Sequence, residues 1–564
     1  MIVSLSGLYS RILNERLTQV VETHNLLGEV QNGFRRGRMA SDNAFILDTI
    51  LWKAKAKKQK VNFAFFDVAK AYDTVDRDIL WRRMSSLGFG GEFLDSIKSI
   101  YSGDSVQCTV NGLTTRPVFL RRGLRQGCSL SPMLFNLYIA GLGNALSLSE
   151  DGFQVGGCFI SALFFADDLV VIARDREGLL RLMKLVKTHT DWLRLEINTG
   201  KDKSEVLAQE GAVGDQWEVL SDDGDIVLSL KQVLEYRYLG TQVQGSMFKT
   251  AVRKVKQCVS KAHKYKGSCI YISRDGPDVV DMILATWCNV AVPAILFGCE
   301  MIPFSESAIC EIERVQSQIA KYALGLPLGS ASVCAQVELG IKPFRQVLYE
   351  TQLKFYARVL CLEDSRWVKQ AMQDHLSVSW KSPYVAYIHR IRLELGLYAL
   401  PLRGTGLLTE IGSHFLSHLN GRIADLALPW IRPVKRLKRL QYAREGANSE
   451  AISAFRYDSA DIGNKYPRLG RVEVQRYCPL CPVATRNTVM HLTFFCHSME
   501  LFRRQETTMS SFRNMCVAKG FSEDYVFELF VNGYDWNENP VPIQDFLARG
   551  FDLRRLRESF LSRW

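Results

Sequence analysis

Residues 162–173 read Ala-Leu-Phe-Phe-Ala-Asp-Asp-Leu-Val-Val-Ile-Ala and give the clearest local signal of structure in the chain. Two apolar runs of β-type residues are separated by only three positions, so we predict a tight β-hairpin here. Its turn holds Asp167 and Asp168. Acidic residues are common in turns, where they are solvated and bond the local backbone, so this pair alone is weak evidence of a functional site.

A second acid ends another predicted strand. The run from Val61 to Val68 reads as a buried strand, with Asp67 near its end. Nucleotidyl transfer needs two Mg²⁺ ions about 4 Å apart, and these hard cations prefer oxygen ligands. A few carboxylates on rigid neighbouring strands supply such ligands, so Asp67, Asp167 and Asp168 are candidate magnesium ligands.

Three motifs, in this order along the chain, resemble those of reverse transcriptases. They are Phe66-Asp67-Val68-Ala69-Lys70-Ala71-Tyr72-Asp73, then Arg122 to Pro132 with Gln126-Gly127 and Ser131-Pro132, then Phe164-Phe165-Ala166-Asp167-Asp168. Two more resemble motifs of the non-LTR (LINE-type) retrotransposon branch, a fingers motif at residues 31–38 and a primer-grip motif at residues 236–240. The resemblance covers residues 3–245 well and the region beyond only loosely.

The resemblance implies an RNA-directed DNA polymerase that copies an RNA template from a DNA primer or a nicked DNA target, with dNTP as substrate. Asp67 and Asp168 would hold two Mg²⁺ ions, and Asp167 would be the third acid and the direct ligand of the pair. Tyr72 would stack under the sugar and clash with a 2′-hydroxyl, although plain core packing is the alternative for this residue. The family also implies a nuclear location.

Further residues are implied to bind the nucleotide. Gln126 and Gly127 would line its pocket, Gly127 because a position without a side chain lets the backbone approach closely. Lys203 would be a general acid toward pyrophosphate or, as readily, a solvated surface lysine. Arg35 and Arg38 suit triphosphate or template phosphates because guanidinium groups match phosphate geometry, unless they are only solvated.

Four residues of metal-binding type cluster in the C-terminal region. Cys478 and Cys481 form a Cys-x-x-Cys knuckle, His491 follows after nine residues and Cys496 after four more. Zn²⁺ prefers tetrahedral sulfur and nitrogen ligands, so the spacing predicts a structural zinc site. His497 is an alternative fourth ligand. The alternative to a zinc site is that these cysteines are unrelated reduced thiols. The cluster resembles the Cys-Cys-His-Cys zinc knuckle that follows the polymerase in non-LTR retrotransposon proteins, and it is expected to bind target DNA or template RNA through phosphates.

Strand and helix patterns alternate from about residue 61 to 245 and then turn helical. With the resemblance, this predicts an α+β fold: a right-hand polymerase whose fingers and palm contain an antiparallel sheet, followed by a helical thumb and connector region and a small zinc knuckle. The expected domains are partial fingers (1–60), palm and remaining fingers (61–245), thumb and linker (246–445), and the end of a basic segment with the knuckle and tail (446–564).

The bulk properties agree with a nucleic-acid partner. The chain of 564 residues carries a net charge of +12, and basic side chains gain affinity for polyanions by releasing condensed counterions. A basic solubility face is the alternative. No apolar run reaches about 18 residues, so we expect no membrane span. The 14 cysteines are scattered, which favours reduced thiols in an intracellular setting.

Two other interpretations stay open. A truncated or domesticated remnant would bind RNA or DNA without catalysis, and the family has fingers sequence before the first residue here, which leads us to expect missing sequence. An intron-encoded maturase or an RNA-copying polymerase shares the three acids, but the knuckle and the Phe-Ala-Asp-Asp form disfavour it. Neither endonuclease arrangement known in the family is recognisable in the sequence, and neither is an RNase H pattern.

Overall fold

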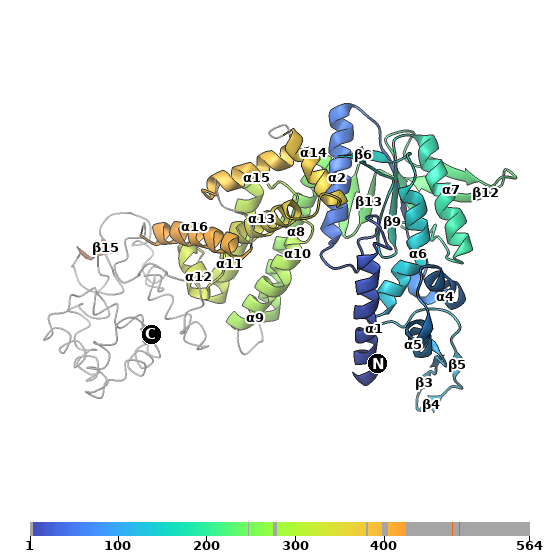
Figure 1. Ribbon diagram of the computed structural model, residues 1–564. Coiled ribbons are helices and arrows are strands. Elements are labelled where there is room, and N and C mark those ends of the chain that lie inside the picture. Colours follow the sequence, from blue (N-terminus) through green and yellow to red (C-terminus); the bar gives the residue numbers. More distant parts are fainter. Residues whose placement is uncertain are drawn as a thin grey trace. The chain divides into compact units, whose positions relative to one another are not determined.

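The computed structural model describes residues 4–245, 247–273, 279–326, 328–378, 382–397 and 404–424, together with 476–477 and 484–485. The chain divides into two compact units. The first comprises Met1–Val255, Glu300–Pro303 and Lys354–Arg390, and the second comprises Lys256–Cys299, Phe304–Leu353 and Ile391–Trp564. The predicted succession of a strand-and-helix region and a helical region is confirmed (Figure 1).

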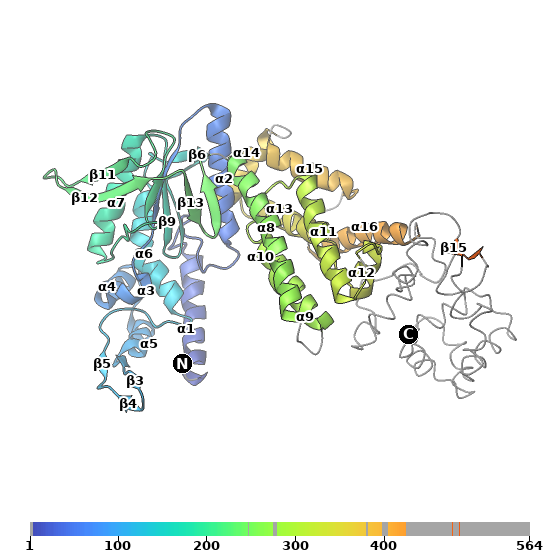
Figure 2. The same ribbon diagram turned by 180° about the vertical axis from the view of Figure 1, so that it is seen from behind.

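The first unit is built on a six-stranded sheet of order β11-β12-β10-β1-β9-β8. Its strands are β1 (Asn62–Phe66), β8 (Ala162–Phe165), β9 (Asp168–Ala173), β10 (Glu205–Leu207), β11 (Gln216–Leu220) and β12 (Ile226–Gln232). Every pairing is antiparallel except that of β10 with β12, which is parallel. Strands β11 and β12 form its outer edge (Figure 2).

Strand β1 lies inside this sheet, between β9 and β10. All five of its residues are buried, as expected of a strand covered on both faces, which reads as an uninterrupted apolar run. Helix α7 (Arg176–Trp192) packs against β1 and β9, whereas α2 (Ala40–Lys57) and α6 (Ser131–Ser147) contact β8. Because β1 is paired on both sides, the backbone of Asp67, which follows its last residue, is held in a fixed position.

Local sequence signals explain where several helices begin and end. Asp175 caps α7, its carboxylate accepting a hydrogen bond from Gly178 N at 2.7 Å, as capping acids do. Helix α4 (Arg77–Ser86) is followed by Gly88 at φ +92°, the left-handed conformation that glycine favours at helix ends. Ser41, although a residue type that often caps helices, does not cap α2. Met39 occupies the cap position and its N–H donates to the Asp42 carboxylate, 3.2 Å away, inside the first turn.

A two-stranded ribbon leaves the first unit between residues 105 and 119. Strands β2 (Ser105–Val106) and β5 (Val118–Phe119) pair, and β3 (Thr109–Val110) pairs with β4 (Leu113–Thr114). Asn111 and Gly112 form the turn between β3 and β4, and both have positive φ, as a type I′ turn requires.

The remaining elements of the first unit surround the sheet. They are α1 (Ser4–Thr23), α3 (Ala71–Thr74), α5 (Gly91–Tyr101), β6 (Phe153–Val155), β7 (Cys158–Ile160), β13 (Glu235–Tyr238), β14 (Thr241–Gln244) and α14 (Trp367–Ser377). Although α14 comes from far along the chain, its Asp374 carboxylate pairs with Lys53 Nζ at 2.5 Å and accepts from Gly156 N at 2.9 Å. This late segment is therefore tied to α2 and to the end of β6.

Helices make up the described part of the second unit and its junctions with the first. They are α8 (Met247–Ser273), α9 (Val279–Thr286), the π-helical turn η1 (Trp287–Ala291), α10 (Val292–Leu296), α11 (Glu306–Ala323), α12 (Ser332–Leu339), α13 (Phe344–Leu360), α15 (Pro383–Glu394) and α16 (Gly404–Ala424). The helices predicted within 251–362 are thus confirmed. The predicted domain boundaries at 60, 245 and 445 stay predictions.

One helical stretch, Val279–Leu296, is long and apolar enough to cross a membrane by length and composition, with a mean hydropathy of 1.8. The expectation that no stretch meets this criterion was wrong. Its Trp287 is fully buried and donates from Nε1 to Gln316 Oε1 of α11 at 3.2 Å, the packing of a core helix. The nine described cysteines are all free thiols.

Candidate active site

The antiparallel register of the sheet brings the predicted acids to one place. Phe66 of β1 pairs with Leu169 of β9, so one further step along both strands sets Asp67 opposite Asp168. Directly opposed residues of antiparallel strands have Cα atoms about 4.5–5.5 Å apart. Because Phe165 pairs with Asp168 across the hairpin, Asp167 lies in the two-residue turn beside them.

The turn that carries Asp167 is held by a distant segment. Ala166, just before it, has φ +57°, a left-handed conformation that alanine rarely adopts. Gln31 Oε1 accepts hydrogen bonds from Ala166 N at 2.9 Å and from Gly33 N at 2.8 Å, and Gln31 Nε2 donates to Ala166 O at 3.3 Å. A Cβ on Gly33 would lie 2.1 Å from Ala166 N, so only glycine permits this approach.

Asp67 is oriented by the stretch that precedes β10. Its backbone N–H donates to Ser204 Oγ at 3.0 Å, and Asn198 Nδ2 donates to its Oδ2 at 2.9 Å. Lys203 Nζ lies 3.6 Å from Asp67 Oδ1. The structure thus places Lys203 beside the acids, whereas the sequence had indicated no role for Asn198 or Ser204.

The three carboxylates repel one another. Burial, Asp167 and Asp67 raise the pKa of Asp168 to about 6, against the opposing effect of Lys203. Burial and Asp67 also raise the pKa of Asp167. A bound divalent cation would neutralise these neighbouring negative charges at the strand end. Carboxylate oxygens are ligands that Mg²⁺ prefers.

Within the described ranges, no three His, Cys, Asp or Glu side chains form a complete metal-binding group. Mg²⁺ is usually held through one or two carboxylates, waters and substrate phosphates, not by an all-protein cage. The acids here, Asp67 with the Asp167-Asp168 pair, fit that open arrangement.

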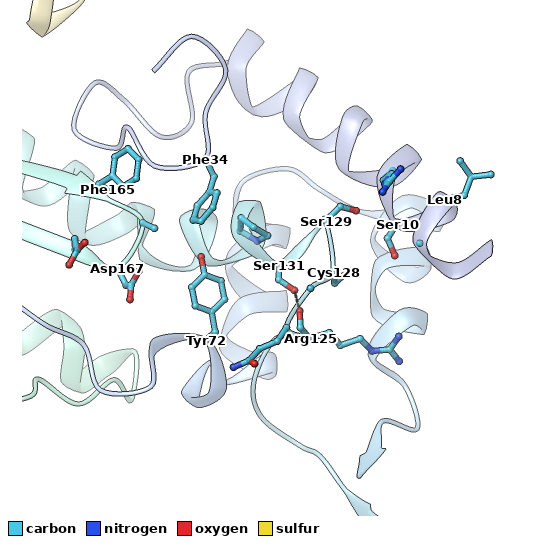
Figure 3. Close-up of a pocket in the computed structure, with 17 residues that line it drawn as sticks. Leu8, Ser10, Phe34, Tyr72, Arg125, Cys128, Ser129, Ser131, Phe165 and Asp167 are labelled. Carbon is cyan, nitrogen blue, oxygen red and sulfur yellow. Dashed lines mark hydrogen bonds between the residues drawn. The ribbon is translucent and has the colours of Figure 1, made fainter. Parts of the chain in front are cut away.

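A cavity of about 1000 Å³ opens beside the acids. Asp167 and Asp168 line one side, and the predicted nucleotide residues Tyr72, Gln126 and Gly127 line it too. The Tyr72 ring stacks on Phe135 with centroids 4.9 Å apart, and its hydroxyl, buried with no partner among the described residues, points into the cavity (Figure 3). The three predicted nucleotide residues and the two acids of the hairpin therefore line the same cavity.

Two arginines that were predicted to bind the nucleotide, Arg35 and Arg38, do not line this cavity. The Arg35 side chain is 1% exposed and pairs with Glu22 at 2.6 Å. Arg38 pairs with Glu29 at 2.5 Å and donates to Asn32 Oδ1 at 2.9 Å. Both guanidinium groups are thus engaged by internal partners, which leaves them poorly placed to bind phosphate.

Two other arginines do line the cavity, and sequence reasoning missed both. Arg125 lies in the Arg122–Pro132 motif and donates from Nε to Asp104 at 2.9 Å. Arg11 extends from α1, is exposed, and has no ion pair within the described part of the chain. The motif could have drawn attention to Arg125, but nothing in the local sequence distinguishes Arg11.

The predicted zinc ligands Cys478, Cys481, His491 and Cys496 lie outside the described residues. Two short strands that flank the first pair are described. β15 (Arg476–Tyr477) and β16 (Ala484–Thr485) pair antiparallel.

Comparisons with known proteins concern the N-terminal part of the chain. The family model for reverse transcriptase (RNA-dependent DNA polymerase) matches residues 1–243. The Pol polyprotein of type-2 retrotransposable element R2DM from Drosophila melanogaster is 29% identical over 243 residues, 42% of this chain and 23% of that protein. The corresponding protein of a type-1 element R2 from Popillia japonica is 32% identical over 213 residues, 37% of this chain and 29% of that protein.

Among solved structures, telomerase from Candida albicans with a fragment of telomeric RNA aligns over 68% of this chain and 58% of that one. The TM-score is 0.33 at 12% identity, a likeness too low to bear on the fold. The sequence matches cover less than a third of either R2 relative. Residues 1–243 thus match the reverse transcriptase family model, and the R2 retrotransposon proteins are among their sequence relatives.

Proposed function

We propose that this chain is the RNA-directed DNA polymerase of a non-LTR retrotransposon, adding dNTPs to a primer 3′-hydroxyl on an RNA template, with a nicked DNA target as the primer. The observation that carries the proposal is the β1–β9 register, which sets Asp67 opposite Asp168 at the rim of the cavity that Tyr72 and Gln126 line. In this assignment residues 1–60 belong to the fingers, 61–245 to the palm and remaining fingers, and 246–445 to the thumb and linker.

Asp67, Asp167 and Asp168 would hold two Mg²⁺ ions. When bound there, Mg²⁺ lowers the pKa of the attacking 3′-hydroxyl and neutralises charge on the triphosphate. The protein's own groups supply orientation: Asn198 and Ser204 fix the Asp67 carboxylate and backbone, and the hairpin fixes the other two acids.

The cavity residues would select and position the nucleotide. The ring of Tyr72, fixed by its stacking on Phe135, would meet the sugar and exclude a 2′-hydroxyl. Gly127 would let the backbone approach the nucleotide closely. Lys203, which already lies beside Asp67, would donate a proton to the departing pyrophosphate. Arg11, on the cavity wall and without an ion pair in the described part of the chain, would take the phosphate-binding role first expected of Arg35 and Arg38, whereas Arg125 also lines the wall but is paired with Asp104.

The C-terminal cysteines would add a structural zinc knuckle. Cys478, Cys481, His491 and Cys496 supply the tetrahedral sulfur and nitrogen set that Zn²⁺ prefers. The paired strands β15 and β16 support this, since they flank the Cys478-to-Cys481 knuckle. The expected result is one bound zinc per chain, lost when Cys478 and Cys481 are both changed to serine and retained in the control Cys516→Ser. Equal zinc content in both variants would refute the site.

The knuckle and the net charge of +12 would favour the binding of target DNA and template RNA through contacts to their phosphates. A nuclear location follows if the primer is a chromosomal nick.

The test of the polymerase is primer extension on a poly(rA)/oligo(dT) hybrid with Mg²⁺. We expect the natural chain to extend the primer and the double variant Asp167→Ala, Asp168→Ala to be inactive. The control is Asp222→Asn, which removes an acid that is 94% exposed and pairs with Lys184 on the surface. If the natural chain and the control both fail to extend while still binding the hybrid, the alternative holds, a non-catalytic RNA- or DNA-binding protein.

A further inference from the structure

Phe34 combines an unusual backbone with an unusual position. Its φ is +55°, in the left-handed region that a bulky side chain rarely enters. Its side chain is nevertheless 58% exposed, so burial does not offset the strain. The same side chain lines the cavity beside the acids.

Contacts on both sides of Phe34 hold this conformation. On one side, Gly33 donates from N to Gln31 Oε1 at 2.8 Å and accepts at O from Asn136 Nδ2 at 2.8 Å. On the other side, the buried Arg35 guanidinium pairs with Glu22 at 2.6 Å and donates to Gln31 O at 3.1 Å. Strained residues persist where the surroundings over-determine them, and such strain concentrates at ligand sites.

The ring faces the space where a nucleotide would lie. Figure 3 shows it near the hydroxyl end of Tyr72, with Asp167 on one side and Ser129 and Ser131 on the other. An exposed aromatic ring in a cavity that also holds two carboxylates and two arginines offers a flat apolar face to a flat, charged ligand. Each nucleobase has such a face, so stacking serves all four bases without reading their edges.

We propose that Phe34 is a stacking platform for the base of the incoming nucleotide, opposite the sugar side that Tyr72 closes. This inference rests on the proposed polymerase function and adds a binding residue to it. The strained backbone keeps the ring in the cavity before the nucleotide arrives, so little ordering is needed on binding.

The test compares Phe34→Gly with Phe34→Trp. Glycine adopts positive φ freely, so Phe34→Gly should leave the melting temperature unchanged or raise it. The same change should raise KM about tenfold for each of the four dNTPs, as loss of one base stack implies, with kcat at saturating dNTP within about twofold. Phe34→Trp, which keeps an aromatic face, should hold KM near that of the natural chain.

A matched control is Phe119→Ala, which removes an equally exposed phenyl ring, 68% exposed, that does not line the cavity. Its KM for dNTP should not change. A second readout without catalysis is the rise in melting temperature that saturating dNTP with Mg²⁺ gives in the absence of primer, which should shrink in Phe34→Gly alone.

Three results would overturn the platform: an unchanged dNTP KM and thermal shift in Phe34→Gly, a loss of stability that parallels the kinetic loss, or weaker binding of the primer–template hybrid with dNTP binding intact. Failure of the polymerase proposal is recognised separately. In that case the natural chain does not extend primers, while the dNTP-dependent thermal shift still decides whether Phe34 contacts the nucleotide.

Discussion

The side-chain oxygen of Gln31 accepts a hydrogen bond from the backbone N–H of Ala166 at 2.9 Å, although the two residues are 135 positions apart. Gln31 Nε2 returns a bond to Ala166 O at 3.3 Å. Both partners are buried, and Ala166 directly precedes Asp167. A glutamine outside the sheet therefore fixes the backbone that aims one of the three acids.

Replacing Gln31 by methionine keeps a side chain of similar size and removes both bonds to Ala166 as well as the bond from Gly33 N. Leaving buried backbone groups unpaired costs about 1–3 kcal/mol, so urea unfolding should show a loss of that size. Because the turn then relaxes, the Mg²⁺ concentration for half-maximal primer extension should rise as well. The control is Gln107→Met on the exposed ribbon, where neither quantity should move. An unchanged Mg²⁺ requirement in Gln31→Met would show that the bond is structural only.

Gly33→Ala tests the close approach of the same segment. Its Cβ would lie 2.1 Å from Ala166 N, which is backbone and cannot swing aside. Forcing atoms into such a contact typically costs about 1–3 kcal/mol, and the shift would reach Asp167. Thermal melting and primer extension should both suffer, whereas Gly157→Ala, with nothing within 4 Å of its Cβ, should behave as the natural chain. Equal melting temperatures in the two variants would contradict this packing.

The raised pKa of Asp168 predicts a pH-dependent stability in the absence of Mg²⁺. Its folded pKa of about 6 exceeds the ordinary value of 3.8, so between these limits the folded chain binds more protons than the unfolded chain. The free energy of unfolding should therefore fall as the pH rises from about 4 to 6. Above pH 6 the unfavourable contribution is fully present, and Asp168→Asn should remove it.

We expect Asp168→Asn to melt at a higher temperature than the natural chain at pH 8 and at the same temperature near pH 4. The difference should be less than about 1 kcal/mol because solvent screens this partly exposed carboxylate. Added Mg²⁺ should stabilise the natural chain at pH 8 and the variant less. A variant that melts lower at pH 8 would show that Asp168 is not repelled by its neighbours.

Tyr72 offers a test of sugar selection. The ring is fixed against Phe135 and its hydroxyl has no partner among the described residues, so Tyr72→Phe should preserve stability and discrimination. Tyr72→Val should remove the obstacle to a 2′-hydroxyl and raise the efficiency of ribonucleotide incorporation relative to dNTP by about tenfold or more, since one steric contact is worth about 1–3 kcal/mol. If Tyr72 were only core packing, Tyr72→Val would lower stability without changing the ratio.

The sequence allowed the hairpin at 162–173 to be predicted to within one residue, because its apolar runs, its turn and its acids are all local; Asp168, which was expected in the turn, is the first residue of β9. The order of the motifs suggested that Asp67 meets that turn, but the pairing itself could not be worked out, since nothing in a single strand sets its register with another. The alternation of polar and apolar residues that usually fixes register is missing in β1, where every side chain is buried.

Which arginines are free to bind phosphate could not be predicted from the local sequence. Arg35 and Arg38 have the chemistry of phosphate ligands, yet Glu22 and Glu29 occupy their guanidinium groups. Whether a guanidinium group pairs with an internal carboxylate or with a substrate phosphate depends on distances in the folded chain, which a local stretch of sequence does not determine. For the same reason Arg11, on a helix with no motif, could not be foreseen as a wall of the cavity.

The position of β1 has a consequence for how the protein is made. Asp67 N finds its partner Ser204 only 137 residues later, and ribosomes add about 5–20 residues per second, so the strand waits on the order of ten seconds for β10 to be synthesised. During that interval β1, which has four apolar residues besides Asn62, lacks its neighbour β10, and until residue 173 has been made it lacks β9 as well. The three acids can therefore meet only after residue 173 has been made, and a nascent chain paused before residue 205 would present one unpaired edge of β1 to chaperones.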